Sequence, residues 1–150
     1  MDKRVEIILI KDTLPADFQR LVEGSLVESI HSMDKLQTYW RSGKERFDSN
    51  GARLFAATYQ GILVGVAGVT REPDQSFQAM RMRRLYVLQE FRRQGIAKRL
   101  ALECMRTGLQ TCATLTCNAK ASIAAPPFWE SLGFQPIEHA SITHIYQRPC

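Results

Sequence analysis

The stretch MRRLYVLQEFRRQGIAKRL, residues 82–100, changes from a strand pattern to a helix pattern across one basic loop. Upstream of the loop we expect a strand over Ala79–Leu88. Downstream, apolar residues recur at helical spacing and predict a helix over Gln94–Leu109; they are Ile96, Leu100, Cys104, Met105 and Leu109. The next segment, Thr111–Cys117, is apolar and β-branched enough for a second strand. A strand–helix–strand unit of this kind predicts a parallel crossover within one sheet.

The start of the predicted helix carries unusual charges for a helix that is stable by itself. A helix N-terminus leaves about four N–H groups without partners and carries roughly half a positive charge. No capping side chain stands here, and four cations crowd the end: Arg92, Arg93, Lys98 and Arg99. Each cation costs about 0.3–1 kcal/mol unless an anion binds there. Gly95 and Ala97 keep the backbone accessible, so the pattern favours a phosphate site. The alternative is a solvated basic helix in which Gly95 only eases a turn.

The positive charge of the chain is concentrated in this segment. The formal net charge is +5, and residues 81–99 hold seven Lys/Arg and one acid, Glu90, which leaves the remainder slightly negative. A uniformly basic surface would indicate loose nucleic-acid binding. One basic segment around one loop instead indicates a specific anionic ligand.

The rest of the chain predicts alternating short elements. Further strands are expected at Val5–Ile10, Arg53–Tyr59, Ile62–Thr70, Phe134–Glu138 and Ile142–Arg148. Further helices are expected at Leu14–Ile30, Asp34–Ser42 and Ile123–Leu132, with polar loops at 43–51 and 72–76. The order is β-α-α-β-β-β-α-β-α-β-β. It predicts an α/β (α+β) fold: a mixed, mostly antiparallel central sheet flanked by helices, in a single domain over residues 1–150.

Composition narrows the class of protein further. No apolar run approaches the roughly 20 residues that span a bilayer, and Val5–Ile10 is too short and too charged for a signal peptide. We therefore expect a cytoplasmic protein that acts away from membranes. The cysteines form no C-x-x-C pair and have no histidine at a metal-ligand spacing, so we expect reduced thiols and no metal; they are Cys104, Cys112, Cys117 and Cys150.

Two motifs resemble the GNAT superfamily of N-acetyltransferases. The first is Arg92-x-x-Gly95-x-Ala97 preceded by Leu85-Tyr86-Val87, which is similar to the pyrophosphate-binding motif of the family. The second, residues 120–134 with Phe128, Trp129 and Gly133-Phe134, is similar to a later family motif. The predicted helix pair and hairpin also occur in the expected order, so the resemblance spans nearly the whole chain.

The resemblance implies acetyl-CoA as co-substrate and a primary amine of a small molecule, peptide or protein as acceptor. The amine would attack the thioester directly in a ternary complex, and a backbone N–H near Val87 or Leu88 would stabilise the oxyanion. The pantetheine arm would pair with the end of the strand at residues 86–88, which requires a splayed or bulged strand. The implied cofactor-binding residues are Tyr86, Val87, Leu88, Arg92, Arg93, Gln94, Gly95, Ile96, Ala97, Lys98, Arg99 and Phe128.

The usual proton-transfer residues of the family are missing. Trp129 stands where a tyrosine acid is common, and Arg81 and Thr116 stand where a glutamate base is common. The catalytic residues are therefore not identified. Candidates for the acceptor site, each also readable as a surface or packing residue, are Glu28, His31, Tyr39 and Arg83.

The arginines of the strand before the loop raise a separate question. Strand alternation places Arg81 and Arg83 on one face and Arg84 on the other. Arg81 and Arg83 are then either solvated charges or the part of the acceptor site that favours an anionic amine.

Three functions remain open from the sequence. The first is an acetyltransferase. The second is a GNAT-like module that binds acyl-CoA without turnover. The third is a nucleic-acid-binding or RNA-directed domain; the sequence does not favour it, because no stretch interleaves the cations with several aromatics. A homodimer, in which the C-terminal strands pair, also stays open.

Overall fold

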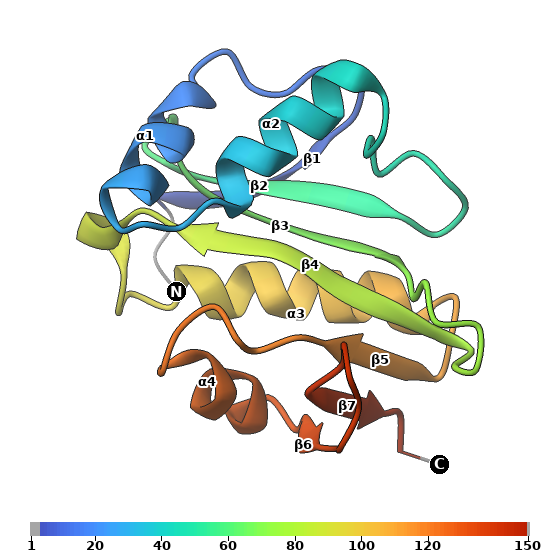
Figure 1. The fold of residues 1–150 in the computed structure, drawn as a ribbon. Coiled ribbons are helices and arrows are strands. Elements are labelled where there is room, and N and C mark those ends of the chain that lie inside the picture. Colours follow the sequence, from blue (N-terminus) through green and yellow to red (C-terminus); the bar gives the residue numbers. More distant parts are fainter. Residues whose placement is uncertain (1–3, 150) are drawn as a thin grey trace.

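The protein is described from a computed structural model over residues 4–149 (Figure 1). Within this part of the chain one seven-stranded sheet has the order β1-β2-β3-β4-β5-β7-β6. The strands are β1 Val5–Ile10, β2 Arg53–Tyr59, β3 Ile62–Arg71, β4 Ala79–Val87, β5 Thr114–Cys117, β6 Gln135–Pro136 and β7 His144–Gln147. The helices are α1 Gln19–Val27, α2 Ser32–Ser42, α3 Ile96–Leu109 and α4 Ala125–Ser131, with a 3-10 turn, η1, at Gln89–Phe91.

The pairing confirms the predicted mixed sheet. Every neighbouring pair of strands is antiparallel except β4 and β5, which α3 connects as a parallel crossover. The parallel pair is short: Ala79–Arg81 of β4 lie beside Thr114–Thr116 of β5. The predicted element order and fold class are therefore confirmed.

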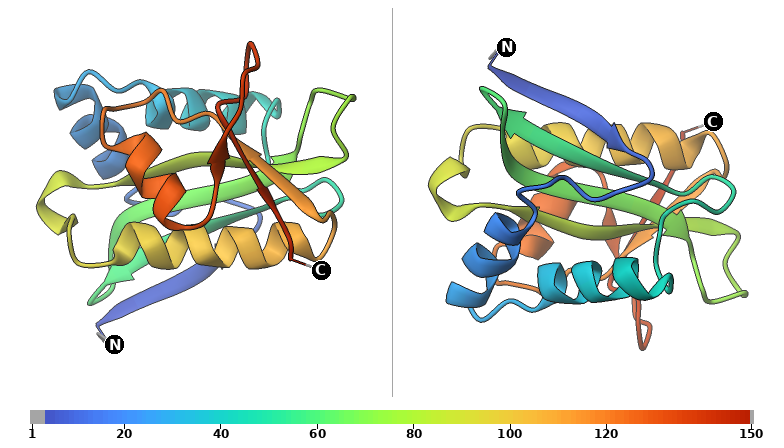
Figure 2. Two further views of the ribbon diagram at one scale, coloured as in Figure 1. Left: turned by 90° about the horizontal axis from the view of Figure 1, so that it is seen from below. Right: turned by 90° about the horizontal axis from the view of Figure 1, so that it is seen from above.

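Helices cover the two faces of the sheet (Figure 2). Side chains alternate across β2, so Leu54 packs with α1 and α2, whereas Phe55 packs with α3. The α1–α2 face is sealed by residues such as Leu21 and Leu36, both 0% exposed. On the opposite face, α3 packs across the sheet centre. The core is thus two apolar layers with the sheet between them.

The first helix is shorter than predicted at both ends. Residues 15–18 form a separate turn closed by the Phe18 N–H and the Pro15 carbonyl at 3.0 Å, so Leu14–Ile30 contains a helix only over Gln19–Val27. The helix ends because Ser29 adopts φ +60°.

The C-terminal elements are also shorter than predicted. Residues 110–112 complete the turn that ends α3, and the N–H groups of Thr111 and Cys112 both donate to the Gly108 carbonyl at 3.0 Å. Consequently β5 begins at Thr114. Strand β6 has two residues, Gln135–Pro136, instead of the five predicted over 134–138.

Candidate active site

Strand β4 loses one of its two neighbours halfway along its length. After Arg81 no residue of β4 pairs with β5, whereas β4 stays paired with β3 as far as Val87 (Figure 1). The side of Met82–Val87 that faces away from β3 is called the open edge below. Its backbone groups have no strand partner, which is the condition for an extended ligand to add itself beside β4.

A β-bulge lies within the open edge, as the expected pantetheine-binding strand requires. Val66 pairs with Tyr86 and Gly68 pairs with Arg83, so two residues of β4 stand opposite Ala67 alone. The extra residue adopts the left-handed region at Arg84, with φ +57°. The prediction that Arg84 lies opposite Arg83 is wrong, because the bulge breaks the alternation and turns both side chains toward Glu45.

The end of β4 directs one N–H group to the open edge. The Leu88 N–H donates to the Val64 carbonyl of β3 at 2.8 Å, so it is not free to stabilise an oxyanion. Backbone groups alternate in direction along a strand, which turns the N–H of Val87 the other way, to the open edge. Of the two N–H groups suggested by the sequence, only that of Val87 suits this role.

The loop before α3 is built from backbone that leaves its N–H groups accessible. Arg93 and Gly95 adopt φ +65° and φ +81°. The first helical bond runs from the Arg99 N–H to the Gly95 carbonyl at 3.0 Å, so the N–H groups of residues 96–98 precede it. No side chain caps α3, and its first turn contains no acid. Such a concave run of N–H groups at a helix N-terminus binds anions.

Arg92 is already engaged with protein groups. Its Nη1 and Nη2 donate to the two carboxylate oxygens of Glu28 at 2.7 Å, and its Nε donates to the Val87 carbonyl at 2.9 Å. The hydrogen bonds from Arg92 hold the pKa of Glu28 below its usual range, despite partial burial of the carboxylate. The guanidinium therefore ties the end of α1 to β4, and a role of Arg92 at the phosphates stays a prediction.

The remaining cations differ in availability. Arg99 donates to the Val5 carbonyl at 3.0 Å. Arg93 and Lys98 are exposed. Neither side chain makes a hydrogen bond or ion pair with another residue in the described range. These two side chains are the cations best placed to meet a bound phosphate.

Tyr86 lies directly beside the Arg92–Glu28 pair. Its hydroxyl donates to a Glu28 oxygen at 2.7 Å, and the guanidinium carbon of Arg92 stands 5.5 Å from the ring centroid. Burial, followed by the hydrogen bond to Glu28, raises the pKa of Tyr86, so the phenol keeps its proton at neutral pH. Glu28, expected only as an acceptor-site candidate, thus organises the end of β4.

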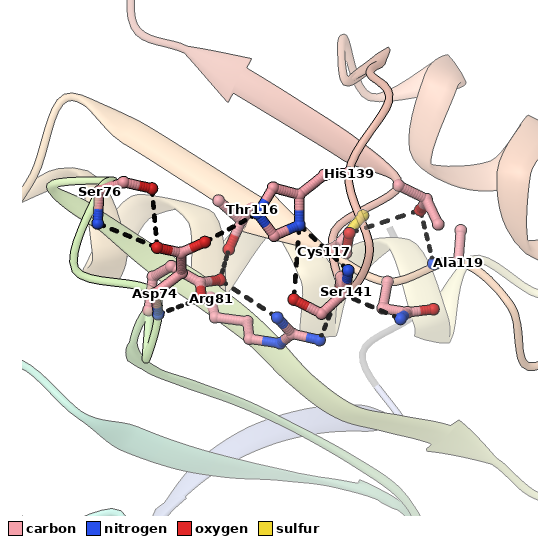
Figure 3. A network of polar contacts seen from close by, with 11 residues as sticks. Asp74, Ser76, Arg81, Thr116, Cys117, Ala119, His139 and Ser141 are labelled. Carbon is pink, nitrogen blue, oxygen red and sulfur yellow. Dashed lines mark hydrogen bonds and ion pairs between the residues drawn. The ribbon is translucent and has the colours of Figure 1, made fainter.

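A buried carboxylate occupies the region where the family-type base was missing. Glu72 is 4% exposed and its Oε1 accepts from the Thr116 hydroxyl at 2.6 Å and from Arg81 at 3.2 Å. Arg81 also donates to the Ser141 carbonyl at 3.1 Å (Figure 3). Burial alone would raise the pKa of Glu72, but the bonds from Thr116, from the Asp74 N–H and from Arg81 outweigh it and lower that pKa. Glu72 is therefore a structural anion and a poor base.

Sequence reasoning missed Glu72 and Glu45, which belong to segments predicted as loops. Glu45 receives a bond from Arg83 at 2.8 Å and one from Arg84 at 3.1 Å. The one signal in the sequence was the excess of arginine on β4, since half-buried guanidinium groups need carboxylate partners. Nothing in the local sequence says which acids supply them.

The other candidates lie on α2, at its N-terminus, and on α4. Tyr39 is half-buried on α2, and His31 is exposed at the N-terminus of that helix. Phe128 is half-buried on α4 and makes an edge-on contact with Trp129 at 5.1 Å between ring centroids. Trp129 is 7% exposed and packs on Phe134, so it is a core residue with no route to a leaving group.

Neither a metal-binding cluster nor a membrane-spanning helix occurs among the described residues. No group of three or more His, Cys, Asp or Glu side chains is arranged to hold a metal ion over residues 4–149. In the same range no helix has the length and apolar character needed to span a bilayer.

Comparison with known structures places this geometry among acetyltransferases. A proposed acetyltransferase from Exiguobacterium sp. 255-15 is 26% identical, with 98% of this chain and 94% of that chain covered and a TM-score of 0.85. YncA from Salmonella typhimurium, solved with acetyl-CoA, is 13% identical over 98% of this chain and 95% of its own, with a TM-score of 0.70. The PaiA N-acetyltransferase of Thermoplasma acidophilum, solved with coenzyme A, is 15% identical over 95% of this chain and 98% of its own, with a TM-score of 0.64.

Sequence comparison gives the family directly. No curated protein is a significant match to the chain. The acetyltransferase (GNAT) domain family, however, matches residues 28–144. This range contains β4, the open edge, the uncapped start of α3 and the α4 motif. The chain therefore belongs to the GNAT acetyltransferase family.

Proposed function

We propose that the protein transfers the acetyl group of acetyl-CoA to a primary amine, by direct attack within a ternary complex. The observation that carries this proposal is the open edge of β4 leading to an uncapped helix N-terminus. The first feature suits the extended pantetheine arm, and the second suits the pyrophosphate. The start of α3 has no acid and no side-chain cap, and the exposed cations Arg93 and Lys98 beside it form no ion pair with another described residue.

The residues present fit coenzyme A. The N–H groups of residues 93–98 would hold the pyrophosphate, and Arg93 and Lys98 would add positive charge. Gly95 is required by its backbone conformation, because a Cβ there would meet nothing within 4 Å but φ +81° is strained for other residues. Phe128, half-buried on α4, would pack along the apolar part of the cofactor.

The chemistry of transfer asks little of the protein beyond orientation and charge stabilisation. The bound cofactor supplies a thioester, which is already reactive toward amines. The Val87 N–H would donate to the carbonyl oxygen as negative charge develops on it, and this type of contact is worth about 3–4 kcal/mol in other enzymes. Holding the amine beside the thioester supplies much of the remaining acceleration.

Neither Glu28 nor Tyr86, the titratable side chains that meet at the end of β4, is suited to remove the proton of the amine. The lowered pKa of Glu28 makes it a weak base, and Tyr86 keeps its own proton. We therefore propose that the amine loses its proton to water before attack. The rate should then rise with pH until the free amine dominates, with no plateau from a protein base.

Calorimetric titration of acetyl-CoA into the wild type and into Gly95→Glu tests the cofactor site. We expect micromolar binding to the wild type and none to the variant, because the carboxylate would stand among the N–H groups meant for phosphate. Gly43→Glu is the matched control: Gly43 has φ +82° and nothing within 4 Å of its Cβ position, but it ends α2. Loss of binding in both variants, or no binding to the wild type, would refute the proposal.

A second function, binding of acyl-CoA without turnover, is favoured by the absent acid and base. Release of free coenzyme A thiol in the presence of a panel of amines distinguishes the two. Thiol release that depends on the amine establishes transfer. Tight acetyl-CoA binding with no amine-dependent release would make the protein a binding module.

A further inference from the structure

A cluster of charged and aromatic side chains lies on the side of β4 that faces α2, at residues that precede the proposed cofactor-binding end of the strand. It is called the Arg83 cluster and consists of Tyr39, Lys44, Glu45, Arg83 and Arg84. Arg83 and Arg84 share the carboxylate of Glu45. The Lys44 ammonium lies 4.3 Å from the Tyr39 ring centroid, and the Arg84 guanidinium lies 5.7 Å from the same centroid. The bulge brings both arginines to this one place.

The Arg83 cluster carries more positive than negative charge. Three cations meet one carboxylate, which leaves a net charge of +2 on these side chains. Arg81 does not add to this excess, because Glu72 neutralises it. The side chains of Arg83 and Arg84 are only 26% and 14% exposed, so solvent screens their charge incompletely.

Arg83 retains hydrogen-bonding capacity directed to solvent. A guanidinium has five N–H donors, and the one hydrogen bond of the Arg83 side chain to a described residue is from Nη2 to Glu45. No buried side-chain nitrogen or oxygen in the described residues lacks a partner, so the other Arg83 nitrogens reach solvent. Burial lowers the pKa of Arg83 despite the neighbouring Glu45, which means that an added anion would stabilise the charged form.

The Arg83 cluster also lies at a suitable distance from the place of transfer. A strand rises about 3.3 Å per residue, so Arg83 precedes Val87 by roughly 10–13 Å along β4. Arg83 pairs with Gly68 and Tyr86 pairs with Val66, two positions that share one face of β3, so both side chains lie on the face covered by α1 and α2. A molecule bound at Arg83 could therefore extend along β4 toward Val87.

We propose that the Arg83 cluster binds the carboxylate of the acceptor, so that the substrate is a primary amine that also carries a carboxylate. This inference rests on the proposed acetyl transfer. A guanidinium binds carboxylates through paired hydrogen bonds, and Arg83, whose Nη2 donates to Glu45, keeps the second N–H of Nη2 and the adjacent N–H of Nε or Nη1 for such a pair. Glu45 orients Arg83 through their ion pair, and the exposed Lys44 adds positive charge to the cluster.

The test compares acceptors that differ only in the carboxylate. Wild-type kcat/KM is measured by thiol release for amino carboxylates of several lengths, for peptides with free C-termini, and for the corresponding carboxamides. We expect the carboxylate member to be favoured by about tenfold or more in at least one pair, as for one charge-assisted contact. Arg83→Gln should abolish that preference, mainly through KM, and Arg83→Lys should restore part of it.

Arg106→Gln is the matched control, because Arg106 is 61% exposed near the end of α3 and pairs with Glu103. It should keep the wild-type preference, and thermal melts should show that all variants are folded. If the protein binds acetyl-CoA and acetylates carboxamides as well as carboxylates, or no carboxylate-bearing amine at all, the carboxylate inference is overturned. If it binds no acetyl-CoA, the proposed function fails first.

Discussion

The two halves of β4 differ although they belong to one strand. Met80 and Arg81 have a strand on either side, whereas Met82–Val87 are paired with β3 only. In the first half Met80 is 0% exposed and packs with Leu115, also 0% exposed. The second half contains the bulge, the left-handed Arg84 and the residues proposed to meet ligands. The half that is paired on both sides thus holds the strand in place, and the adjoining half keeps the backbone groups on one of its sides unpaired for binding.

Gly108, near the end of α3, shows how closely that helix packs on the paired half of β4. A Cβ at Gly108 would lie 2.8 Å from a Leu115 methyl and 3.3 Å from the Met80 Cβ. At Gly95, on the other end of the same helix region, a Cβ would meet nothing within 4 Å. One glycine is needed for packing and the other for backbone conformation beside the open edge.

The largest effect on stability is expected from a cavity next to the paired half of β4. Leu115→Ala should lower the free energy of unfolding by about 2–5 kcal/mol, since it removes a fully buried side chain under α3. Urea unfolding followed by circular dichroism measures it. Leu102→Ala, at a position 45% exposed on α3, is the control and should change stability by less than about 0.5 kcal/mol. Equal losses would show that the close packing of Leu115 against the paired half contributes nothing particular to stability.

A smaller effect on stability is expected from Glu72, whose carboxylate accepts a hydrogen bond from Arg81 of the paired half. Glu72→Gln replaces one carboxylate oxygen by an NH₂ group, which must then face the donors of Thr116 and Arg81 or that of Asp74. We expect a loss of about 1–3 kcal/mol in the free energy of unfolding. Glu6→Gln, on the exposed side of β1, serves as the reference and should be nearly neutral. An unchanged midpoint for Glu72→Gln would mean that the network of Figure 3 is not needed for stability.

The smallest effect on stability is expected at the open half. Glu28→Gln weakens the bonds from Arg92 and Tyr86 and should cost about 1 kcal/mol or less at neutral pH, because Arg92 is 37% exposed. The larger consequence concerns the cofactor. Arg92 would be released from α1, so the affinity for acetyl-CoA, measured by calorimetry, should change more than the stability does.

Acid should reveal the same contact in the wild type. The folded-state pKa of Glu28 lies below its unfolded value of about 4.3, so its contribution is present above pH 4.3 and is lost as pH falls through the folded pKa. Between pH 5 and pH 3 the wild type should therefore lose more free energy of unfolding than Glu28→Gln. Parallel pH curves for the two proteins would show that the ion pair contributes nothing.

The sequence predicted the fold because the order and period of its elements are local properties. Neighbouring residues were enough to predict three features: the hairpin at Gln60-Gly61, the parallel crossover around α3 and the uncapped helix start. Element ends were less predictable, since they depend on single backbone angles such as that of Ser29. The family was recognisable for the same reason, because its two motifs are contiguous.

The sequence by itself thus determined the order of elements, the location of the basic loop and the membership of the family. Only the tertiary structure decided the use of each charge. Glu28 accepts hydrogen bonds from Arg92, which lies 64 positions away in the sequence. Glu45 accepts hydrogen bonds from both Arg83 and Arg84, and Glu72 accepts one from the Thr116 hydroxyl. The physical reason is range: periodicity acts between neighbours along the chain, whereas a half-buried charge is paired by whichever carboxylate the fold brings within about 3 Å.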